Sequence, residues 1–424
     1  DTVVVSSVTQ QLIQGFFACR SIGTHSLRGV AQPMEIFCVT AESTARGRLE
    51  AAGRATLTPL TGRDQEVDLL MQEWELAAGG AGHAILITGE GGIGKSRLVQ
   101  MMKEHVANLP NAWMTPCQCS PYHQNTSMYP FIDLIERVVL KIHRQDSPRE
   151  RLNKLEGMIV QYGLDSRESL PVFAAYHSLP PDAGYEPSPM DPAQQRRHYM
   201  DSMRRILNDR SLKQPLLFVV EDLHWVDPTT LETLKELVHT IPSHRMLAIF
   251  TARPDFLPHW GDPPNTRVLA LERLDASQTR TICVRVARGK RLPEEVVEQI
   301  IERADGVPLF AEELTKMIIG SGLLEEGTDS FQLNGPLPPL AIPSTLRDSL
   351  MARLDRLSAV KEIAQIAAAA HAPFLSATSP NVMNMESWSE LSNPRDLTKI
   401  FQSAEYAPWR SLRESEDARY VGLS

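Results

Sequence analysis

The sequence predicts an α/β fold in which a parallel β-sheet is flanked by helices. Short apolar runs typical of buried strands alternate with helical patterns through residues 57–320, and strands separated by helices pair in parallel. A glycine-rich turn at residues 89–96 lies between one apolar run and the next helical pattern. The predicted strands are Ala84–Thr88, Trp113–Cys117, Leu216–Val220, Met246–Thr251 and Thr266–Leu271.

Smaller units flank the predicted sheet. Residues 1–42 are typical of a small α+β piece, which starts at Asp1 without Met, so we expect it to be cut from a longer protein. Residues 43–56 suit a linker, 276–335 a helical lid, and 336–370 the start of a further helical region. Residues 371–424 lack helical periodicity and predict an irregular segment. Local expectations are strands at Val3–Ser6 and Met34–Val39, a helix at Thr9–Gly15, a proline-rich loop at residues 180–192, and two helices around Gly306-Val307-Pro308.

The overall composition favours a globular protein of about two to three domains. Of the 424 residues, 42% are hydrophobic, which is enough for ordinary cores. The net charge of −9 makes a nucleic-acid partner unlikely, since such binders usually carry a basic excess.

The cysteines and the hydropathy indicate a reducing compartment. The five cysteines are sparse and odd in number, so no disulfide framework is expected. Cys117 and Cys119 form a lone C-x-C without a second Cys/His pair at zinc spacing, which favours packing thiols over a metal site. No apolar run reaches the ~18 residues that span a membrane, and no signal peptide is visible. We expect a bacterial cytoplasmic protein.

The glycine-rich turn predicts a phosphate site. Gly89-Glu90-Gly91-Gly92-Ile93-Gly94-Lys95-Ser96 matches G-x-x-x-x-G-K-[ST], with a strand before it and a helix pattern after it. Glycines let the loop turn its N–H groups toward phosphate oxygens, and the helix N-terminus adds partial positive charge. Lys95 is expected to reach the β- and γ-phosphates, and the Ser96 hydroxyl to bind Mg²⁺. The alternative is a chance glycine-rich turn.

A second motif supplies carboxylates. The apolar run Leu216–Val220 ends in Glu221 and Asp222, as a Walker B strand does. We expect this strand to lie beside the strand that precedes the P-loop, with Glu221 holding Mg²⁺ and Asp222 orienting a water. The alternative is a strand that ends at an acidic turn, with Asp222 capping the next segment.

Three further residues are candidates for sensing or binding the nucleotide. His224 follows the two acids and is expected to act as a sensor rather than a base, with a structural histidine as the alternative. Arg253 ends another predicted strand, where it would contact the γ-phosphate or simply be a surface arginine. Pro308 either packs on the adenine or only interrupts a helix.

These residues together resemble the STAND class of P-loop ATPases, signal-transduction relatives of AAA+ proteins, and most closely those fused behind class III nucleotide cyclases. The resemblance spans residues 57–370. It implies a slow ATPase switch in which nucleotide joins a core, residues 57–275, to the lid. Many members carry Asp where this chain has Glu221. The resemblance is carried by Leu60–Glu66, Cys119–Asn125, Glu221–Trp225, Thr251–Pro254, Asp305–Pro308 and Ile342–Leu357.

The resemblance and the motifs together assign the site. Its Gly62-Arg63 motif is implied to contribute to the nucleotide pocket. The catalytic candidates are Lys95, Glu221, Asp222 and Arg253, and the metal candidates are Ser96 and Glu221. The candidates for binding ATP are Gly62, Arg63, Gly89, Glu90, Gly91, Gly92, Ile93, Gly94, Lys95, Ser96, Arg97 and Pro308. The expected partners are ATP or ADP, proteins bound through the lid and the region beyond it, and further copies of the chain in a nucleotide-dependent association.

The two ends resemble other families. Residues 1–42 are similar to the last strands of a class III nucleotide cyclase domain, through Asp1–Ser6, Gly23, His25–Val30 and Pro33–Val39. The catalytic aspartates of such cyclases lie upstream, so cyclase activity is not expected here. Residues 371–424 are similar to the large subunit of the type VI secretion sheath. The carrying residues are Ala372–Ala377, Ser387-Trp388, Asn393–Leu397, Ile400-Phe401, Tyr406, Trp409–Ser411 and Arg413–Leu423.

The patterns change within Ala367–His371, which favours a recombination or assembly product over a functional fusion. Three hypotheses follow: an ATP-binding switch, a cyclase signalling protein whose catalytic half is missing, and a type VI sheath component.

Overall fold

The computed structural model describes residues 3–25, 33–43, 58–143, 145–258, 260, 261, 263 and 265–335. The chain divides into one unit of residues 1–344 and a second from residue 345, and every described residue belongs to the first. The predictions for residues 336–370 and 371–424 therefore fall outside the described part. No helix in the ranges given above is long and apolar enough to cross a membrane.

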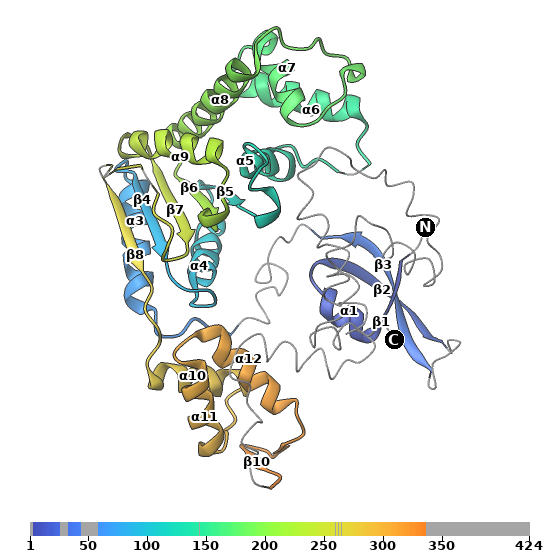
Figure 1. The fold of residues 1–424 in the computed structure, drawn as a ribbon, viewed down its shortest axis with the longest axis vertical. Coiled ribbons are helices and arrows are strands. Elements are labelled where there is room, and N and C mark those ends of the chain that lie inside the picture. The colour runs from blue at the N-terminus through green and yellow to red at the C-terminus, as the bar shows by residue number, and fades with distance from the viewer. Residues whose placement is uncertain are drawn as a thin grey trace, which may run out of the picture. The chain divides into compact units, whose positions relative to one another are not determined.

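The central element is a five-stranded parallel sheet, which confirms the predicted α/β fold (Figure 1). All five predicted strands are present within a residue or two of their expected bounds. Their spatial order is β5-β6-β7-β4-β8. The strands are β4 (His83–Thr88), β5 (Trp113–Gln118), β6 (Leu216–Glu221), β7 (Met246–Ala252) and β8 (Thr266–Ala270).

The order of the strands corrects one expectation. The strand that ends in the two acids, β6, does not lie beside β4, because β7 pairs with both of them and separates them. All seven residues of β7 are buried, as suits an interior strand. By contrast β8 is an edge strand on which Val268 is 67% exposed.

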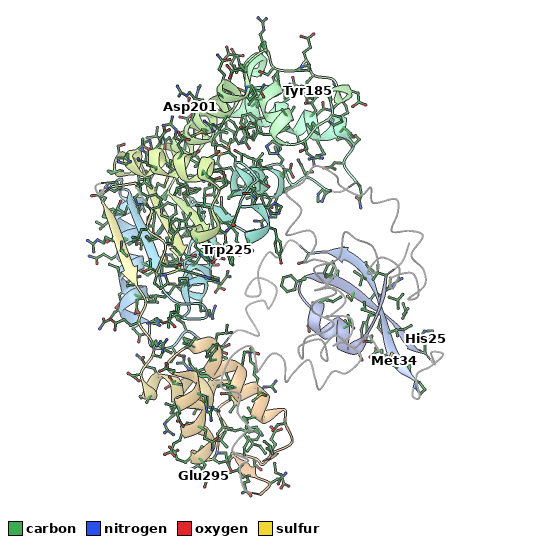
Figure 2. The ribbon with its side chains drawn as sticks, viewed as in Figure 1. His25, Met34, Tyr185, Asp201, Trp225 and Glu295 are labelled. Atoms are coloured by element: carbon green, nitrogen blue, oxygen red, sulfur yellow. The ribbon has the colours of Figure 1, made fainter. Side chains whose placement is uncertain are left out.

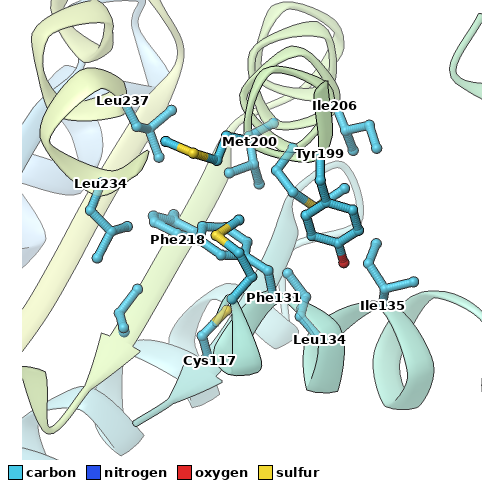
Figure 3. Close-up of a cluster of buried hydrophobic side chains, with 14 of the residues drawn as sticks. Cys117, Phe131, Leu134, Ile135, Tyr199, Met200, Ile206, Phe218, Leu234 and Leu237 are labelled. Atoms are coloured by element: carbon cyan, nitrogen blue, oxygen red, sulfur yellow. The ribbon is translucent and has the colours of Figure 1, made fainter. Parts of the chain in front are cut away.

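Helices cover both faces of the sheet. Helices α3 (Asp64–Ala78) and α4 (Lys95–Ala107) pack on one face, with Leu217 and Val219 of β6 in their core. The alternate residues Leu216, Phe218 and Val220 enter the core on the opposite face. Phe218 packs there near Phe131, Tyr199 and Leu237 (Figure 3). The strand therefore follows the period of two that buries both of its faces.

A helical insertion separates β5 from β6, and none of its helices was predicted. The proline-rich segment predicted as a loop contains only a short 3₁₀ turn, Pro181–Ala183. The next helix then starts at Pro192, where Asp191 caps it. The insertion contains α5 (Tyr129–Asp133), a π-helix (Leu134–Val139), α6 (Pro148–Gln161), α7 (Ser166–Tyr176) and α8 (Pro192–Lys213), and α9 (Pro228–Thr240) follows β6.

The lid is helical, as expected, and ends in a small hairpin. Its buried side chains form a core of their own. The predicted helix break at Gly306-Val307-Pro308 separates α11 from α12. The lid elements are α10 (Ala276–Val286), α11 (Glu294–Ala304), α12 (Pro308–Ile319), β9 (Leu324–Glu326) and β10 (Phe331–Leu333).

The N-terminal piece is a three-stranded antiparallel sheet with one helix. Its strand order is β1-β3-β2, and β2 was not predicted. His25 and Met34 are cross-strand partners at the end of the β2–β3 pair (Figure 2). The elements are β1 (Val4–Ser6), α1 (Ser7–Ile13), β2 (Phe17–His25) and β3 (Met34–Glu42).

Candidate nucleotide-binding site

The P-loop, Gly89–Ser96, joins the end of β4 to the start of α4. Gly94 occupies the N-cap of α4 with φ +110°, a backbone conformation that side chains other than glycine rarely adopt. No side chain caps this helix end, and its first turn contains no acid. A Cβ at Gly94 would meet no atom within 4 Å. The uncapped N–H groups and the space beside them fit an anion such as a phosphate.

Lys95 lies in the first turn of α4 and is only 8% exposed. Its Nζ donates hydrogen bonds to the carbonyl oxygens of Gly89 and Glu90, at 2.6 and 2.8 Å. Burial lowers the pKa of Lys95, the charge of Asp222 opposes that shift, and Arg253 adds to it. The P-loop ammonium is therefore held over the loop, within the electrostatic reach of one acid and one arginine.

The two acids that end β6 have different surroundings. Glu221 is 8% exposed and accepts a hydrogen bond from Lys103 of α4, with 2.8 Å between Nζ and Oε1. Asp222 leaves the strand in the left-handed conformation, at φ 61° and ψ 46°. Its N–H donates to Thr251 Oγ1 at 2.9 Å, and Gln118 Nε2 lies 3.5 Å from Asp222 Oδ2. The charge of Asp222 also raises the pKa of Lys95, against the effect of burial.

The carboxyl ends of β6 and β7 bring the sensor candidates close together. The Arg253 guanidinium is exposed and lies 5.6 Å from the centre of the Trp225 ring (Figure 2). Neither ring nitrogen of His224 has a hydrogen-bond partner among the described residues, although both are buried. Burial lowers the pKa of His224, Asp222 opposes the shift, and Arg253 and Lys95 add to it. His224 is thus a neutral imidazole beside the charged groups of the site.

The two arginines expected at the nucleotide, Arg63 and Arg97, donate to backbone oxygens around the loop. Arg63 is 5% exposed and donates to the carbonyls of Ile93 and Glu272, at 3.3 and 2.6 Å, while it pairs with Glu66. Arg97 donates to the carbonyl of Thr58 at 3.2 Å. In this structure Arg63 fixes the P-loop to the segment that follows β8.

The lid contacts the P-loop directly at one place and through Arg273 at a second. The N–H of Leu309, in the first turn of α12, donates to the carbonyl of Gly92 at 3.2 Å. A Cβ at Gly92 would lie 2.9 Å from Leu309 Cβ, so the glycine permits this approach. Arg273 binds both carboxylate oxygens of Glu90 at 2.9 Å and also pairs with Asp305 at the end of α11. Pro308 begins the helix that reaches the loop.

Several contacts around the site were not predicted. These are the hydrogen bonds from Lys103 to Glu221, from Gln118 to Asp222 and from Arg273 to Glu90. All three join distant parts of the chain. One signal was available for Lys103, which follows Val99 by one helical turn on the apolar face of α4. The other two had no local pattern.

The residues present fit Mg²⁺ bound together with a nucleotide. Such ions usually take one or two protein oxygens and complete their shell with phosphate and water. The Ser96 hydroxyl and a carboxylate at the end of β6 offer oxygens of that kind. No cluster of three or more His, Cys, Asp or Glu able to hold a metal exists in the part of the chain that the structure covers.

The site and the strand order define a P-loop NTPase fold, and comparisons with known families agree. Residues 59–249 match the AAA ATPase domain. Residues 345–424 match the tail sheath N-terminal domain. The second match includes the segment similar to a type VI sheath subunit from residue 371 onward.

Two individual relatives match different shares of the chain. An uncharacterised protein of Rhizobium meliloti is 27% identical over 377 residues, which are 87% of this chain and 35% of that protein. A type VI secretion system sheath protein of Pseudomonas aeruginosa is 73% identical over 63 residues, which are 15% of this chain and 13% of that protein. The chain therefore spans about a third of the first relative and a smaller share of the second.

Two solved structures also align with the chain. A STAND protein with a tetratricopeptide repeat sensor from Pyrococcus horikoshii aligns at 11% identity and a TM-score of 0.33, over 61% of this chain and 30% of that one. The Aeropyrum pernix ORC1 protein, solved in complex with DNA, aligns at 12% identity and a TM-score of 0.41, over 87% and 85%. Neither score is high enough to support an argument about function.

Proposed function

We propose that this chain is a Mg-ATP-binding regulatory ATPase in which the nucleotide controls the contact between the P-loop and the lid. The observation that carries the proposal is the direct hydrogen bond from Leu309 N–H to the Gly92 carbonyl within the phosphate loop. A ligand held by the N–H groups of the same loop acts on the groups that hold the lid. Small shifts at packed contacts of this kind favour one arrangement over another.

Each residue of the site would have its own role in binding or hydrolysing the nucleotide. Lys95 and the N–H groups at the start of α4 bind phosphate oxygens, and Ser96 with a carboxylate at the end of β6 faces the metal. Magnesium would neutralise charge on the phosphates. Asp222 orients the attacking water, and Arg253, exposed beside Trp225, responds to the γ-phosphate. His224 adds a neutral imidazole to this edge and acts as a sensor. We expect slow hydrolysis, because phosphoryl transfer depends on how well these groups are positioned.

Binding of Mg-ATP measured by titration calorimetry tests the proposal. Lys95→Ala removes the P-loop ammonium, and Lys235→Ala, an exposed lysine on α9, serves as the matched control. We expect affinity to be lost in the first variant and kept in the second. Equal affinity in all three proteins, or no binding by the parent chain, would refute the proposal. Asp222→Asn then separates binding from hydrolysis, since it should slow turnover while the nucleotide still binds.

A second candidate function rests on the match of residues 345–424 to the tail sheath domain. A sheath component would assemble into tubules without any dependence on nucleotide. Electron microscopy of the purified chain, with and without Mg-ATP, distinguishes the two functions. The origin of residues 1–42 in a cyclase domain is also a proposal, and a cyclic AMP assay on this chain should give no product. A bacterial cytoplasmic location and nucleotide-dependent self-association belong to the same proposal.

A further inference from the structure

The segment that leads into α3, residues 58–63, has no helix or strand of its own, and we call it the entry segment. Since no helix or sheet satisfies its backbone oxygens, side chains from other parts of the chain bind them. Arg97, near the start of α4, donates to the carbonyl of Thr58 at 3.2 Å. The ATPase core therefore holds the first residue of the entry segment through the helix that follows the P-loop.

Arg285 holds the middle of the entry segment from the lid. It lies in the last turn of α10, and its Nη1 donates to the carbonyls of Pro59 and Leu60 at 3.1 and 2.9 Å. The same nitrogen donates to Thr61 Oγ1 at 2.6 Å. Hydrogen bonds from a charged donor are stronger than those between neutral groups. One guanidinium nitrogen thus joins the lid to three consecutive residues that lie 224–226 positions away in the sequence.

The first turn of α10 also contacts the entry segment. Gly62 has φ +63°, and a Cβ at this position would lie 2.5 Å from Gln278 Cδ. Gln278 is fixed there by the capping box of α10, in which it exchanges hydrogen bonds of 2.8 and 3.0 Å with Asp275. Both ends of the lid helix are therefore in contact with the entry segment, and a glycine permits the closer of the two approaches.

Arg63 connects the entry segment to the P-loop. Its buried guanidinium donates to the carbonyl of Ile93, the residue that precedes the N-cap of α4. A buried charge needs its partners, because leaving one unpaired costs much free energy. Arg63 follows Thr61 by two residues, so the hydrogen bonds of Arg285 restrict where Arg63 can lie. A continuous set of contacts therefore runs from the lid through the entry segment to the phosphate loop.

We propose that Arg285 is a positioning residue of the nucleotide site, which holds the entry segment so that Arg63 supports the P-loop at Ile93. This inference rests on the proposed function, because it names a lid residue on which binding of Mg-ATP depends. Among the described residues, the hydrogen bonds of Arg285 all go to the entry segment. Its effect on the nucleotide therefore passes through Arg63. Nucleotide binding and the contact between lid and entry segment favour each other, because such coupling is reciprocal.

Two arginines of one helix provide the first test. Arg285→Met keeps the aliphatic part of the side chain and removes the hydrogen bonds to the entry segment. Arg280→Met is the matched control, because Arg280 lies on the same helix but pairs with Glu294, within the lid. The measurement is the affinity of the full chain for a non-hydrolysable ATP analogue with Mg²⁺, by calorimetry.

We expect the affinity to fall about fivefold or more in Arg285→Met, and by less than about twofold in Arg280→Met. Both variants lose one positive charge from α10, so a difference between them does not arise from net charge. An Arg285→Met variant that binds as tightly as the parent, or an equal loss in the two variants, would overturn the proposal.

A double-mutant cycle tests whether Arg285 acts through Arg63. Arg63→Lys weakens the support of the loop by itself, so Arg285→Met should cost less than about twofold more in that background. A role for Arg285 in the stability of the lid alone predicts two independent losses of affinity that multiply. Multiplied losses in the double variant would contradict the positioning role. Urea midpoints of the four proteins show separately how much each replacement affects folding.

The proposed function and this inference fail in different ways. A parent chain that binds no analogue contradicts the proposed function and removes the basis for the inference. A parent chain that binds, together with an Arg285→Met variant of equal affinity, contradicts only the positioning role. If the variants at Arg63 fold poorly, the comparison of Arg285→Met with Arg280→Met still decides the question, because neither of these arginines is buried.

Discussion

Replacing Asp227 with alanine tests how the segment after β6 is anchored. Asp227 is 3% exposed and caps α9, where its Oδ1 accepts the N–H of Thr230 at 2.9 Å. The same oxygen accepts the N–H of Met128 at 3.2 Å, in a fully buried turn with φ 63°. One carboxylate therefore joins the start of α9 to the turn that begins the helical insertion.

The magnitude follows from the two backbone N–H groups that lose a partner. Loss of a helix N-cap costs about 1 kcal/mol, and an unsatisfied buried N–H costs about 1–3 kcal/mol more. We expect Asp227→Ala to reduce the free energy of unfolding by roughly 2–4 kcal/mol, or roughly 30- to 1,000-fold in the unfolding constant. The assay is urea unfolding followed by tryptophan fluorescence.

Asp191→Ala is the matched control for this prediction. Asp191 caps α8 in the same way, with Gln194 N–H at 2.9 Å, but it is exposed and binds no distant group. We expect a loss of about 1 kcal/mol there. If the two variants unfold within about 0.5 kcal/mol of each other, the buried Met128 N–H contributes nothing and the reasoning is wrong.

Three further predictions concern the site. Arg63→Lys should weaken Mg-ATP binding about tenfold in calorimetry, because an ammonium cannot bridge two carbonyls and Glu66 as the guanidinium does. Arg280→Lys, on the surface of the lid, is the control. Unchanged affinity in Arg63→Lys would contradict this prediction. The depressed pKa of His224 means that the unfolded chain binds a proton first as the pH falls below about 6.5. The free energy of unfolding should therefore decline from pH 7 toward pH 5.5 more steeply in the parent than in His224→Gln. Urea titrations at each pH measure this, and parallel curves for the two proteins would contradict the prediction. Gly92→Ala introduces a Cβ 2.9 Å from Leu309 at φ +83° and should speed tryptic cleavage in the lid. Gly91→Ala is the control, because a Cβ there meets nothing within 4 Å and should leave the cleavage rate unchanged. Equal cleavage rates in the two variants would refute the role of this contact.

The sequence was sufficient for the parts of the fold that depend on local patterns. The interior strands β4, β6 and β7 are short apolar runs, and burial on both faces explains why such runs are continuous rather than alternating. The P-loop was predictable for the same reason, since its glycines, Lys95 and Ser96 are consecutive. The positions of these residues relative to β4 and α4 follow directly from the motif.

The pairing of distant segments could not be predicted from the sequence. Nothing local to β6 indicates that β7, which follows it in the chain, lies between it and β4. The partner of Glu221 is 118 residues away, and Arg63 binds a carbonyl 209 residues away. The Walker B pattern predicted two carboxylates at the end of the strand, and the ion pair of the first with Lys103 of α4 was not part of that pattern.

The contacts between loop and lid explain why binding at the P-loop would be felt beyond it. Glu90 and Gly92 lie two residues apart in the loop, and each has its own partner outside it: Arg273 for the carboxylate and Leu309 N–H for the carbonyl. Arg273 also pairs with Asp305, so the same guanidinium contacts the loop and the end of α11. A bound phosphate would add negative charge near Glu90, which would raise the cost of leaving that carboxylate unpaired and favour retention of Arg273. An ion pair and a backbone hydrogen bond thus connect the loop to groups outside it, and the proposed switch would act through these two contacts.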